Sequence, residues 1–283
     1  MLQNIKTQIR RARETSKLLS ASDTLKVHLA KLYSNKRKAI IEFHINGFEK
    51  HFKIRARGTD LEVALQIFSE RDYDLNWCKP YREHIHNLCR QVRQEGNIPL
   101  IVDAGANIGA STLLFASAFP ECEVFAIEPD AGNFEMLQRN VRTLQNVRTF
   151  RAGLWDKPTS LAVEWTRGTG WAQRVKEISC PNSDTLASVT IPQLLKLDPL
   201  LRPIIVKIDI EGAEVQVLRS NNGWVDDVPL MIFEAHDNLW GWLGTWQGSA
   251  NAFLSCLIRK KREYLTRGEN VFAFMHPKPI SPC

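Results

Sequence analysis

From residue 99 onward, short apolar segments typical of buried strands alternate with amphipathic segments typical of helices. The expected strands are 99–103, 123–128, 147–152, 203–209 and 229–235, and the expected helices are 110–119, 131–145, 213–221 and around 249–261. Strands that are joined by helices pair in parallel, so this alternation predicts an α/β fold with a doubly wound, mostly parallel sheet. An inserted hairpin is expected at 159–165 and 172–179, and a closing antiparallel hairpin at 262–267 and 270–275.

The segment before this alternation predicts an N-terminal extension made of helices and a β-hairpin. Residues 39–45 and 48–54 alternate around Asn46-Gly47, a favoured two-residue turn, and helices are expected at 61–68 and 80–95. Residues 2–34 carry apolar side chains at helical spacing among basic ones, which predicts one long helix. We therefore expect a basic helical extension (1–38), a lead-in region (39–98) and a catalytic domain (99–283).

Positive charge is concentrated at the N-terminus. Residues 1–38 hold ten Lys and Arg against two acidic residues, whereas residues 39–283 hold 27 against 29. A nucleic-acid-binding protein spreads basic residues along a face of its fold, so this distribution argues against a nucleic-acid partner. The favoured interpretation of the basic helix is packing on the body or on a second subunit, as in a homo-oligomer. The alternative is peripheral contact with a membrane surface or an acidic partner.

The composition predicts a folded cytoplasmic protein. No uninterrupted apolar stretch reaches the roughly 18 residues that a transmembrane helix needs, and no signal-peptide pattern follows the N-terminal charges. The six cysteines include no C-x-x-C pair and no metal-ligand spacing, so we expect reduced thiols.

A glycine-containing loop after the first strand predicts a nucleotide-like cofactor. Gly105 and Gly109 stand between an apolar strand and a helix, where glycine lets the backbone pass close to a ligand. Glu128, 19 residues after Gly109, ends the next strand and can accept hydrogen bonds from ribose hydroxyls. Asp103 beside the loop suits a cationic ligand and repels a pyrophosphate. S-adenosylmethionine is therefore favoured over a nicotinamide cofactor.

Two later strands bring polar residues to the same edge of the sheet. Asp209 and Glu211 follow one strand, and Glu234 and His236 follow the other. His236 is the candidate general base for methyl transfer to oxygen, because an imidazole titrates near neutral pH. Asp209 and Glu211 would position the acceptor hydroxyl. A divalent metal in this cluster remains an alternative, and we assign no metal ligands.

Missing motifs narrow the reaction class. Nucleic-acid amino methyltransferases carry an N/D-P-P-aromatic segment where this chain has Asp209-Ile210-Glu211-Gly212, so methylation of nucleic acid is disfavoured. Neither G-x-S-x-G nor a P-loop is present, which argues against a hydrolase and against an NTPase.

The sequence also carries a set of family motifs: V-D-A-G-A-N-I-G at 102–109, A-I-E-P-D at 126–130, K-I-D-I-E-G-A-E at 207–214, E-x-H at 234–236 and, upstream, R-G-T-D-L-E-V-A-L-Q-I-F at 57–68. This set resembles the FkbM family of class I methyltransferases over roughly residues 40–275. The resemblance implies a Rossmann-like seven-stranded fold and S-adenosylmethionine-dependent O-methylation, often of sugar or polyketide hydroxyls. It implies cofactor contacts by Asp103, Gly105, Ala106, Asn107, Gly109 and Glu128, with Asp156 near the adenine. Ala110 departs from the family, in which an aromatic residue is often found at this position.

The acceptor is expected to be a small molecule or glycan precursor. Trp240, Trp242 and Trp246 could stack on a sugar ring, although packing of their loop onto the sheet explains them as well. We therefore predict an O-methyltransferase for a sugar hydroxyl. The alternatives are a polyketide or lipid-linked acceptor, and a cofactor-binding scaffold without turnover.

Overall fold

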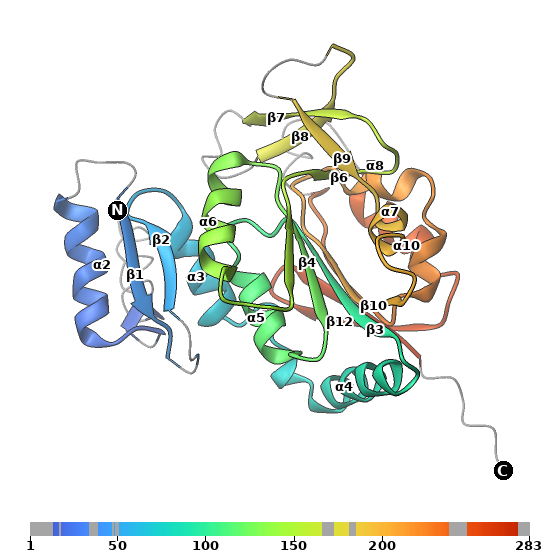
Figure 1. The fold of residues 1–283 in the computed structure, drawn as a ribbon, viewed down its shortest axis with the longest axis horizontal. Coiled ribbons are helices and arrows are strands. Elements are labelled where there is room, and N and C mark those ends of the chain that lie inside the picture. The colour runs from blue at the N-terminus through green and yellow to red at the C-terminus, as the bar shows by residue number, and fades with distance from the viewer. Residues whose placement is uncertain are drawn as a thin grey trace.

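The computed structural model describes residues 14–16, 18–33, 39–46, 48, 51–165, 173–180, 185–237 and 248–276. Its centre is a seven-stranded sheet with the order β12-β13-β11-β10-β3-β4-β5 (Figure 1). The strands are β3 (Ile98–Ala104), β4 (Glu123–Ile127), β5 (Val147–Phe150), β10 (Leu201–Ile208), β11 (Leu230–Glu234), β12 (Arg262–Arg267) and β13 (Asn270–Met275). The five strands β11-β10-β3-β4-β5 are parallel, and β13 and β12 close the sheet antiparallel. The predicted Rossmann-like doubly wound fold is confirmed.

Helices cover both faces of the sheet. One face packs against α3 (Asp60–Phe68), α4 (Lys79–Gln94), α5 (Ala110–Ala118) and α6 (Ala131–Val141), and the other against α7 (Ile191–Leu195), α8 (Glu214–Arg219) and α10 (Ser249–Leu257). Along β3 the side chains alternate between these two cores: Ile101 faces the first, and Leu100 and Val102 face the second. A strand buried on both faces is continuously apolar, which explains why residues 98–104 are so hydrophobic.

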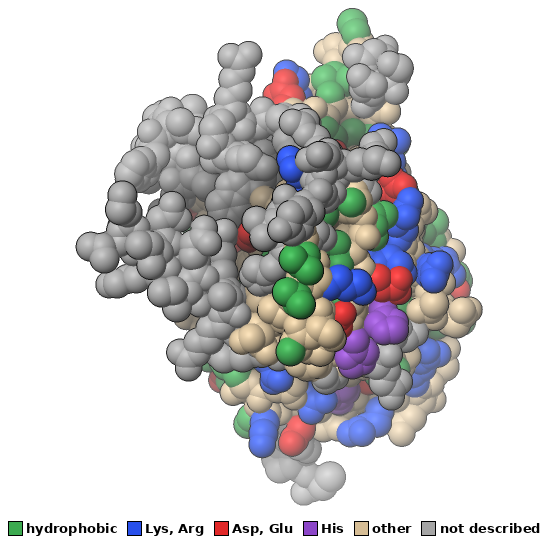
Figure 2. Space-filling view, turned by 90° about the vertical axis from the view of Figure 1, so that its left-hand side faces the viewer, with side chains coloured by type: hydrophobic (Ala, Val, Ile, Leu, Met, Phe, Trp, Pro, Cys, Tyr) green, Lys and Arg blue, Asp and Glu red, His purple; other side chains and the backbone are tan. Residues whose placement is uncertain are grey.

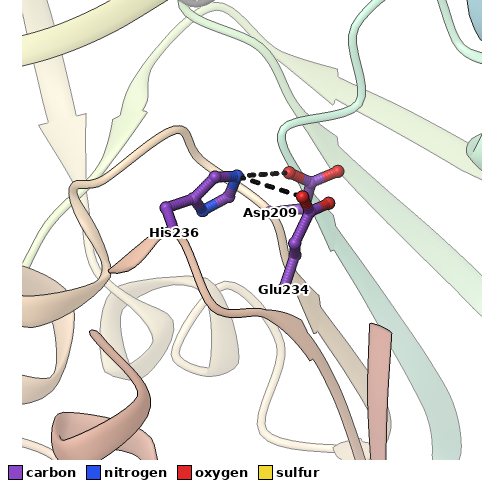
Figure 3. A group of neighbouring side chains, drawn as sticks. All are labelled: Asp209, Glu234 and His236. Carbon is purple, nitrogen blue, oxygen red and sulfur yellow. Dashed lines mark ion pairs between the residues drawn. The ribbon is translucent and has the colours of Figure 1, made fainter. Parts of the chain in front are cut away.

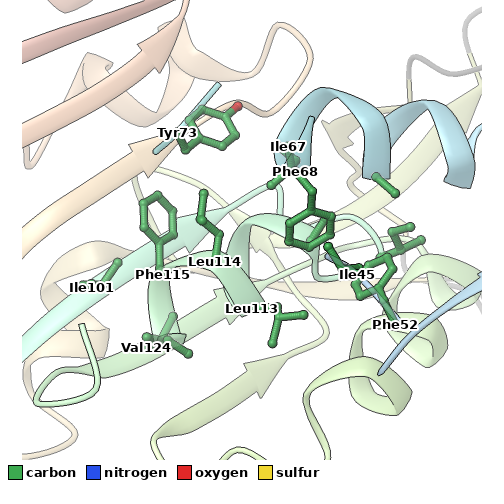
Figure 4. Close-up of a cluster of buried hydrophobic side chains, with 14 of the residues drawn as sticks. Ile45, Phe52, Ile67, Phe68, Tyr73, Ile101, Leu113, Leu114, Phe115 and Val124 are labelled. Atoms are coloured by element: carbon green, nitrogen blue, oxygen red, sulfur yellow. The ribbon is translucent and has the colours of Figure 1, made fainter. Parts of the chain in front are cut away.

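The lead-in segment completes the first core. The hairpin of β1 (Ile40–His44) and β2 (His51–Arg55) forms as predicted, and α3 packs between it and α5. Figure 4 shows Phe52 and Phe68 beside Leu113, while Tyr73 lies over Phe115. All of these side chains are buried, so the lead-in region and the sheet share one hydrophobic core.

The N-terminal helix differs from the prediction of one continuous helix over 2–34. In the described part, helical residues at 14–16 and 18 are separated from α2 (Ala21–Tyr33) by a break at 19–20. The Ser20 hydroxyl accepts a hydrogen bond from the backbone N–H of Asp23 and so caps the new helix. Leu18 and Leu19 are buried at the break. Where described residues are visible on the face shown in Figure 2, Lys and Arg side chains lie next to Asp and Glu side chains. Examples of such neighbours near the hairpin are the pairs Lys26–Asp23 and Lys53–Glu42.

A small second sheet follows β5. It contains β6 (Gly153–Leu154), β7 (Ser160–Trp165), β8 (Gln173–Glu177) and β9 (Leu186–Val189) in the order β6-β9-β7-β8. The inserted hairpin is confirmed as β7 and β8. The strands β6 and β9 were not expected, because β9 lies far from its partner β6 in the sequence and no local turn signals their pairing.

Two further findings concern the described residues. None of their helices combines the length and apolar character needed to cross a membrane. Their five cysteines are free thiols, and the sulfurs of Cys89 and Cys122 lie 3.3 Å apart.

Candidate active site

The carboxyl ends of β3, β4, β10 and β11 surround a cavity of about 930 Å³. The chain proceeds from β3 outward to β4 and β5 and later returns to β10 on the other side of β3, so the strand order reverses at this point. Ligands of open α/β sheets bind at such a reversal. Residues of α3 (Glu62, Val63), Tyr73, the end hairpin (Gly268, Glu269) and the small second sheet also line the cavity.

The glycine loop forms one side of the cavity, as predicted. Gly105, Ala106, Asn107 and Glu128 all line it. Gly105 has a φ of 77°, and a Cβ atom there would lie 1.8 Å from the carbonyl oxygen of Asp209, so only glycine fits between the two strand ends. The loop is held by the N–H groups of Gly105 and Ala106, which donate to the Ile127 carbonyl at 3.0 Å each.

Glu128 is buried and fixed by the backbone. Its two carboxylate oxygens accept hydrogen bonds from the N–H groups of Asn107 and Asp130, each at 2.9 Å. Burial raises the pKa of Glu128 to about 7, although these hydrogen bonds oppose the shift. The carboxylate still lines the cavity, so its remaining lone pairs are available to hydroxyl groups of a ligand.

Asp103 does not face the cavity, contrary to the prediction that it meets the cationic part of a ligand. Its side chain is fully buried and accepts hydrogen bonds from the hydroxyls of Ser111 (2.7 Å) and Thr112 (2.6 Å). Its other oxygen lies 3.2 Å from the Lys207 Nζ, because the parallel register of β3 and β10 places Lys207 directly opposite Asp103. The carboxylate is therefore neutralised inside the protein.

Two other predicted cofactor contacts also lie outside this cavity. Gly109 is the N-cap residue of α5 with a φ of 88°, and it packs against Leu137, to which a Cβ atom would approach within 2.8 Å. Asp156 lines a separate, smaller cavity, and its carboxylate accepts a hydrogen bond from the Ser220 hydroxyl at 2.7 Å. Gly109 and Asp156 therefore serve packing and hydrogen bonding within the protein, and neither lines the main cavity.

Lys207 is a site residue that the sequence analysis missed. Its buried ammonium donates to the Gly105 carbonyl at 2.7 Å and also lies 3.5 Å from Asp209. Burial alone would lower the pKa of Lys207, but Asp103 and Asp209 outweigh it and raise the pKa. A lysine within an otherwise apolar strand was the available signal, because a buried ammonium requires buried carboxylates. Lys207 thus connects the glycine loop to the opposite side of the site.

The polar residues that follow β10 and β11 converge as predicted. Asp209, Glu211, Glu234 and His236 all line the cavity, and Figure 3 shows His236 pointing at Asp209 and Glu234. The His236 Nε2 lies 3.7 Å from Asp209, 3.7 Å from Glu211 and 3.6 Å from Glu234. Tyr73 donates a hydrogen bond to Asp209 at 2.9 Å.

The residue that orients His236 is Glu214, which was not a predicted site residue. The Glu214 Oε1 lies 2.8 Å from the His236 Nδ1 and also accepts from the N–H groups of Ile210 and Gly212. Both side chains are buried. Glu214 is part of the K-I-D-I-E-G-A-E motif, but its spacing alone does not show that the turn after β10 folds the carboxylate back onto β11.

The charges in this cluster affect one another strongly. Burial lowers the pKa of His236, but Glu214, Asp209 and Glu211 outweigh this effect and raise it to about 10. Burial and the charge of Asp209 raise the pKa of Glu211 to about 7 and that of Glu234 to about 8. Asp209 has a lowered pKa because Lys207 and His236 overcome the effect of its burial. Negative charge is therefore in excess at this end of the cavity.

The three tryptophans that were considered as acceptor contacts, Trp240, Trp242 and Trp246, lie outside the described residues.

Comparison with known families decides the class of protein. The family model described as the methyltransferase FkbM domain matches residues 103–255, more than half of the chain. The chain belongs to the FkbM methyltransferase family. The resemblance drawn from the motifs is thereby confirmed, and the FkbM match includes the glycine loop, Glu128 and the cluster around His236.

Individual FkbM relatives are distant. Hexuronic acid methyltransferase AglP of Haloferax volcanii is 27% identical over 135 residues, which are 47% of this chain and 54% of the relative. Methyltransferase sdnD of Sordaria araneosa is 23% identical over 173 residues, covering 50% and 67%. The match thus spans about half the length of AglP. A solved putative O-methyltransferase from Klebsiella pneumoniae has a TM-score of 0.39 at 14% identity, covering 69% of this chain and 80% of that chain, and adds nothing to the assignment.

Proposed function

We propose that this protein is an S-adenosylmethionine-dependent O-methyltransferase that acts on a hydroxyl group of a sugar or glycan precursor. The observation that carries the proposal is the cavity itself. One continuous space is lined both by Gly105, Asn107 and Glu128 of the predicted cofactor site and by Asp209 and His236 of the predicted reaction site. A methyl donor and an acceptor must meet within bonding distance, and such a shared space supports this arrangement.

The residues present fit S-adenosylmethionine. Glu128 ends β4 with its carboxylate held at the cavity wall, where it can accept hydrogen bonds from both ribose hydroxyls. Gly105 and Asn107 line the cavity beside Glu128, so the glycine loop can contact a ligand that Glu128 holds. Glu62, Glu128, Asp209, Glu211, Glu234 and Glu269 line a space whose basic lining residues, among those described, are Lys207 and His236. This excess of carboxylates suits a cationic sulfonium compound and disfavours a dinucleotide with two phosphates.

The acceptor would occupy the side of the cavity next to β10 and β11. S-adenosylmethionine supplies a methyl group on a sulfonium centre. The acceptor oxygen forms the new O–CH₃ bond, the C–S bond breaks with its electron pair going to sulfur, and the hydroxyl proton must go to the protein. His236, the predicted base, is enclosed by carboxylates that hold its own proton at neutral pH unless another cation replaces it. We propose Glu211 as the proton acceptor, because its carboxylate lines the cavity 3.7 Å from the His236 Nε2.

The sugar acceptor is supported by the relative AglP, whose name specifies a hexuronic acid as its substrate. Hydroxyl groups of such an acceptor need several hydrogen-bonding partners, and the cavity supplies them through Tyr73, Asp209 and Glu269.

The test combines binding and turnover. Calorimetric titration with S-adenosylmethionine should show binding by the natural protein and weaker binding by Glu128→Gln. Transfer of a labelled methyl group to uronic acid glycosides should then be detected by mass spectrometry. Binding without transfer to any sugar, polyketide or lipid-linked hydroxyl would favour a scaffold. A folded protein that does not bind S-adenosylmethionine would refute the proposal.

A further inference from the structure

Three side chains at the acceptor end of the cavity are arranged as ligands around a common point. Asp209, Glu234 and His236 each offer one atom, and these atoms all lie within 4.8 Å of one another. Figure 3 shows the imidazole edge and the two carboxylates turned toward the same space. They come from the ends of adjacent parallel strands, β10 and β11, so the sheet itself holds them together.

The distances within the group are too long for hydrogen bonds. The His236 Nε2 lies 3.6 Å from Glu234 and 3.7 Å from Asp209, beyond the usual 2.7–3.2 Å range. Ligand bonds of about 2.0–2.2 Å at tetrahedral or octahedral angles place neighbouring ligand atoms about 2.8–3.6 Å apart. A small inward rotation of the carboxylates would therefore bring all three atoms to bonding distance of one ion.

A buried carboxylate holds the other side of the His236 imidazole in place. His236 is 3% exposed, and its Nδ1 is paired with the buried Glu214 at 2.8 Å. Its backbone N–H donates to the Ser249 hydroxyl at 2.9 Å. A carboxylate on the far nitrogen of a ligating histidine fixes its tautomer and ring orientation in metal sites. Nε2, by contrast, makes no hydrogen bond with any described residue and is directed into the cavity.

The carboxylates around His236 also favour the binding of a cation. Asp209, Glu211, Glu214 and Glu234 surround His236, and the nearest basic side chain, Lys207, is shared with Asp103 and Gly105. These carboxylates repel one another unless a positive charge lies between them, and either the proton on His236 or a bound cation that replaces it can supply that charge.

We propose that Asp209, Glu234 and His236 bind one divalent cation through a carboxylate oxygen each and the imidazole Nε2. Two carboxylates with one imidazole suit a first-row ion of intermediate hardness, and Mn²⁺ is the appropriate probe. Three protein ligands leave coordination positions free on the cavity side. This inference rests on the proposed function for its role: the ion would bind the acceptor oxygen and lower its pKa, so that Glu211 receives the proton more readily.

The experiment measures Mn²⁺ binding by the full chain after treatment with a chelator. We expect one Mn²⁺ per chain, with nitrogen modulation in its pulsed electron paramagnetic resonance spectrum from the His236 imidazole. Loss of an outer carboxylate partner weakens metal sites by about 10–100-fold, so Glu214→Gln should fall in that range and the isosteric ligand variants Asp209→Asn and Glu234→Gln should lose more. His236→Gln should abolish the nitrogen signal.

Glu62→Gln is the matched control, because Glu62 is a carboxylate of the same cavity that is not in the group of three. Glu62→Gln should keep the affinity of the natural protein for Mn²⁺. Equal affinity in Glu234→Gln and Glu62→Gln, or binding without the nitrogen signal, would overturn the site. A chain that binds S-adenosylmethionine and transfers methyl groups after complete chelation would overturn the cation and leave the proposed function intact. Specific Mn²⁺ binding without S-adenosylmethionine binding would leave the cation site and refute the function.

Discussion

Replacing Lys207 by methionine tests whether the buried ion pairs hold the two sides of the site together. The Lys207 side chain is 2% exposed, and its ammonium contacts three groups: the Gly105 carbonyl, the carboxylate of Asp103 and that of Asp209. Methionine has a similar length and volume, so the substitution removes the charge and the hydrogen bond without leaving a large cavity.

The expected loss of stability follows from the two buried carboxylates that lose their ammonium partner, Asp103 and Asp209. Removing one partner of a buried ion pair costs about 3–5 kcal/mol, because the other charge stays buried. Asp103 keeps its bonds from Ser111 and Thr112, and Asp209 keeps that from Tyr73. We therefore expect a decrease of about 4 kcal/mol in the free energy of unfolding. With a urea dependence of about 3 kcal/mol per molar, the midpoint should fall by about 1.3 M.

The assay is equilibrium urea unfolding followed by tryptophan fluorescence and circular dichroism. Lys157→Met is the control, since Lys157 is half exposed and pairs with the exposed Glu177, and water screens such a pair so that it contributes little to stability. Adding Asp103→Asn to Lys207→Met should restore about 0.5–3 kcal/mol, because the stranded carboxylate is then neutral. The reasoning is wrong if Lys207→Met loses no more stability than Lys157→Met.

Three other changes test the cofactor side and the reaction side separately. Because the pKa of Glu128 is about 7, its carboxylate becomes protonated as the pH falls through that value, and the affinity for S-adenosylmethionine should then fall by up to about tenfold per pH unit. Calorimetry should show that Glu128→Gln loses this pH dependence of the affinity. An unchanged pH dependence in the variant would exclude Glu128 as the titrating group. Gly105→Ala should lower the free energy of unfolding by more than about 1–2 kcal/mol and abolish cofactor binding, because Gly105 has a positive φ and a Cβ atom there would lie 1.8 Å from Asp209. The control Gly223→Ala, where nothing lies within 4 Å of the added Cβ atom, should have the melting temperature of the natural protein. Equal melting temperatures of the two variants would contradict this geometry. Glu211→Gln should lower kcat by about 10²–10⁴, because Glu211 is the proposed proton acceptor, with a much smaller effect on the Kd of S-adenosylmethionine. Near-normal turnover would remove Glu211 from the reaction.

The sequence by itself determined the parts of this protein that depend on local periodicity. Alternation of apolar strands and amphipathic helices after residue 98 was enough to predict the doubly wound sheet, the closing hairpin and the position of the glycine loop. Strand ends in a parallel sheet share one edge, so the convergence of Asp209, Glu211, Glu234 and His236 could be predicted as well. The break at Ser20 was harder to predict, because one capping serine competes with a long stretch of helix-forming residues.

Only the tertiary structure decided what each polar side chain faces. A carboxylate at the end of β3 can point to a ligand or to a neighbouring strand, and the register that places Lys207 opposite Asp103 directed it inward. The turn after β10 brought Glu214 onto the Nδ1 of His236 and left Nε2 facing the cavity. Asp156 pairs with Ser220, which lies 64 positions further along the chain. These outcomes depend on contacts between distant segments, and neither periodicity nor motif spacing contains that information.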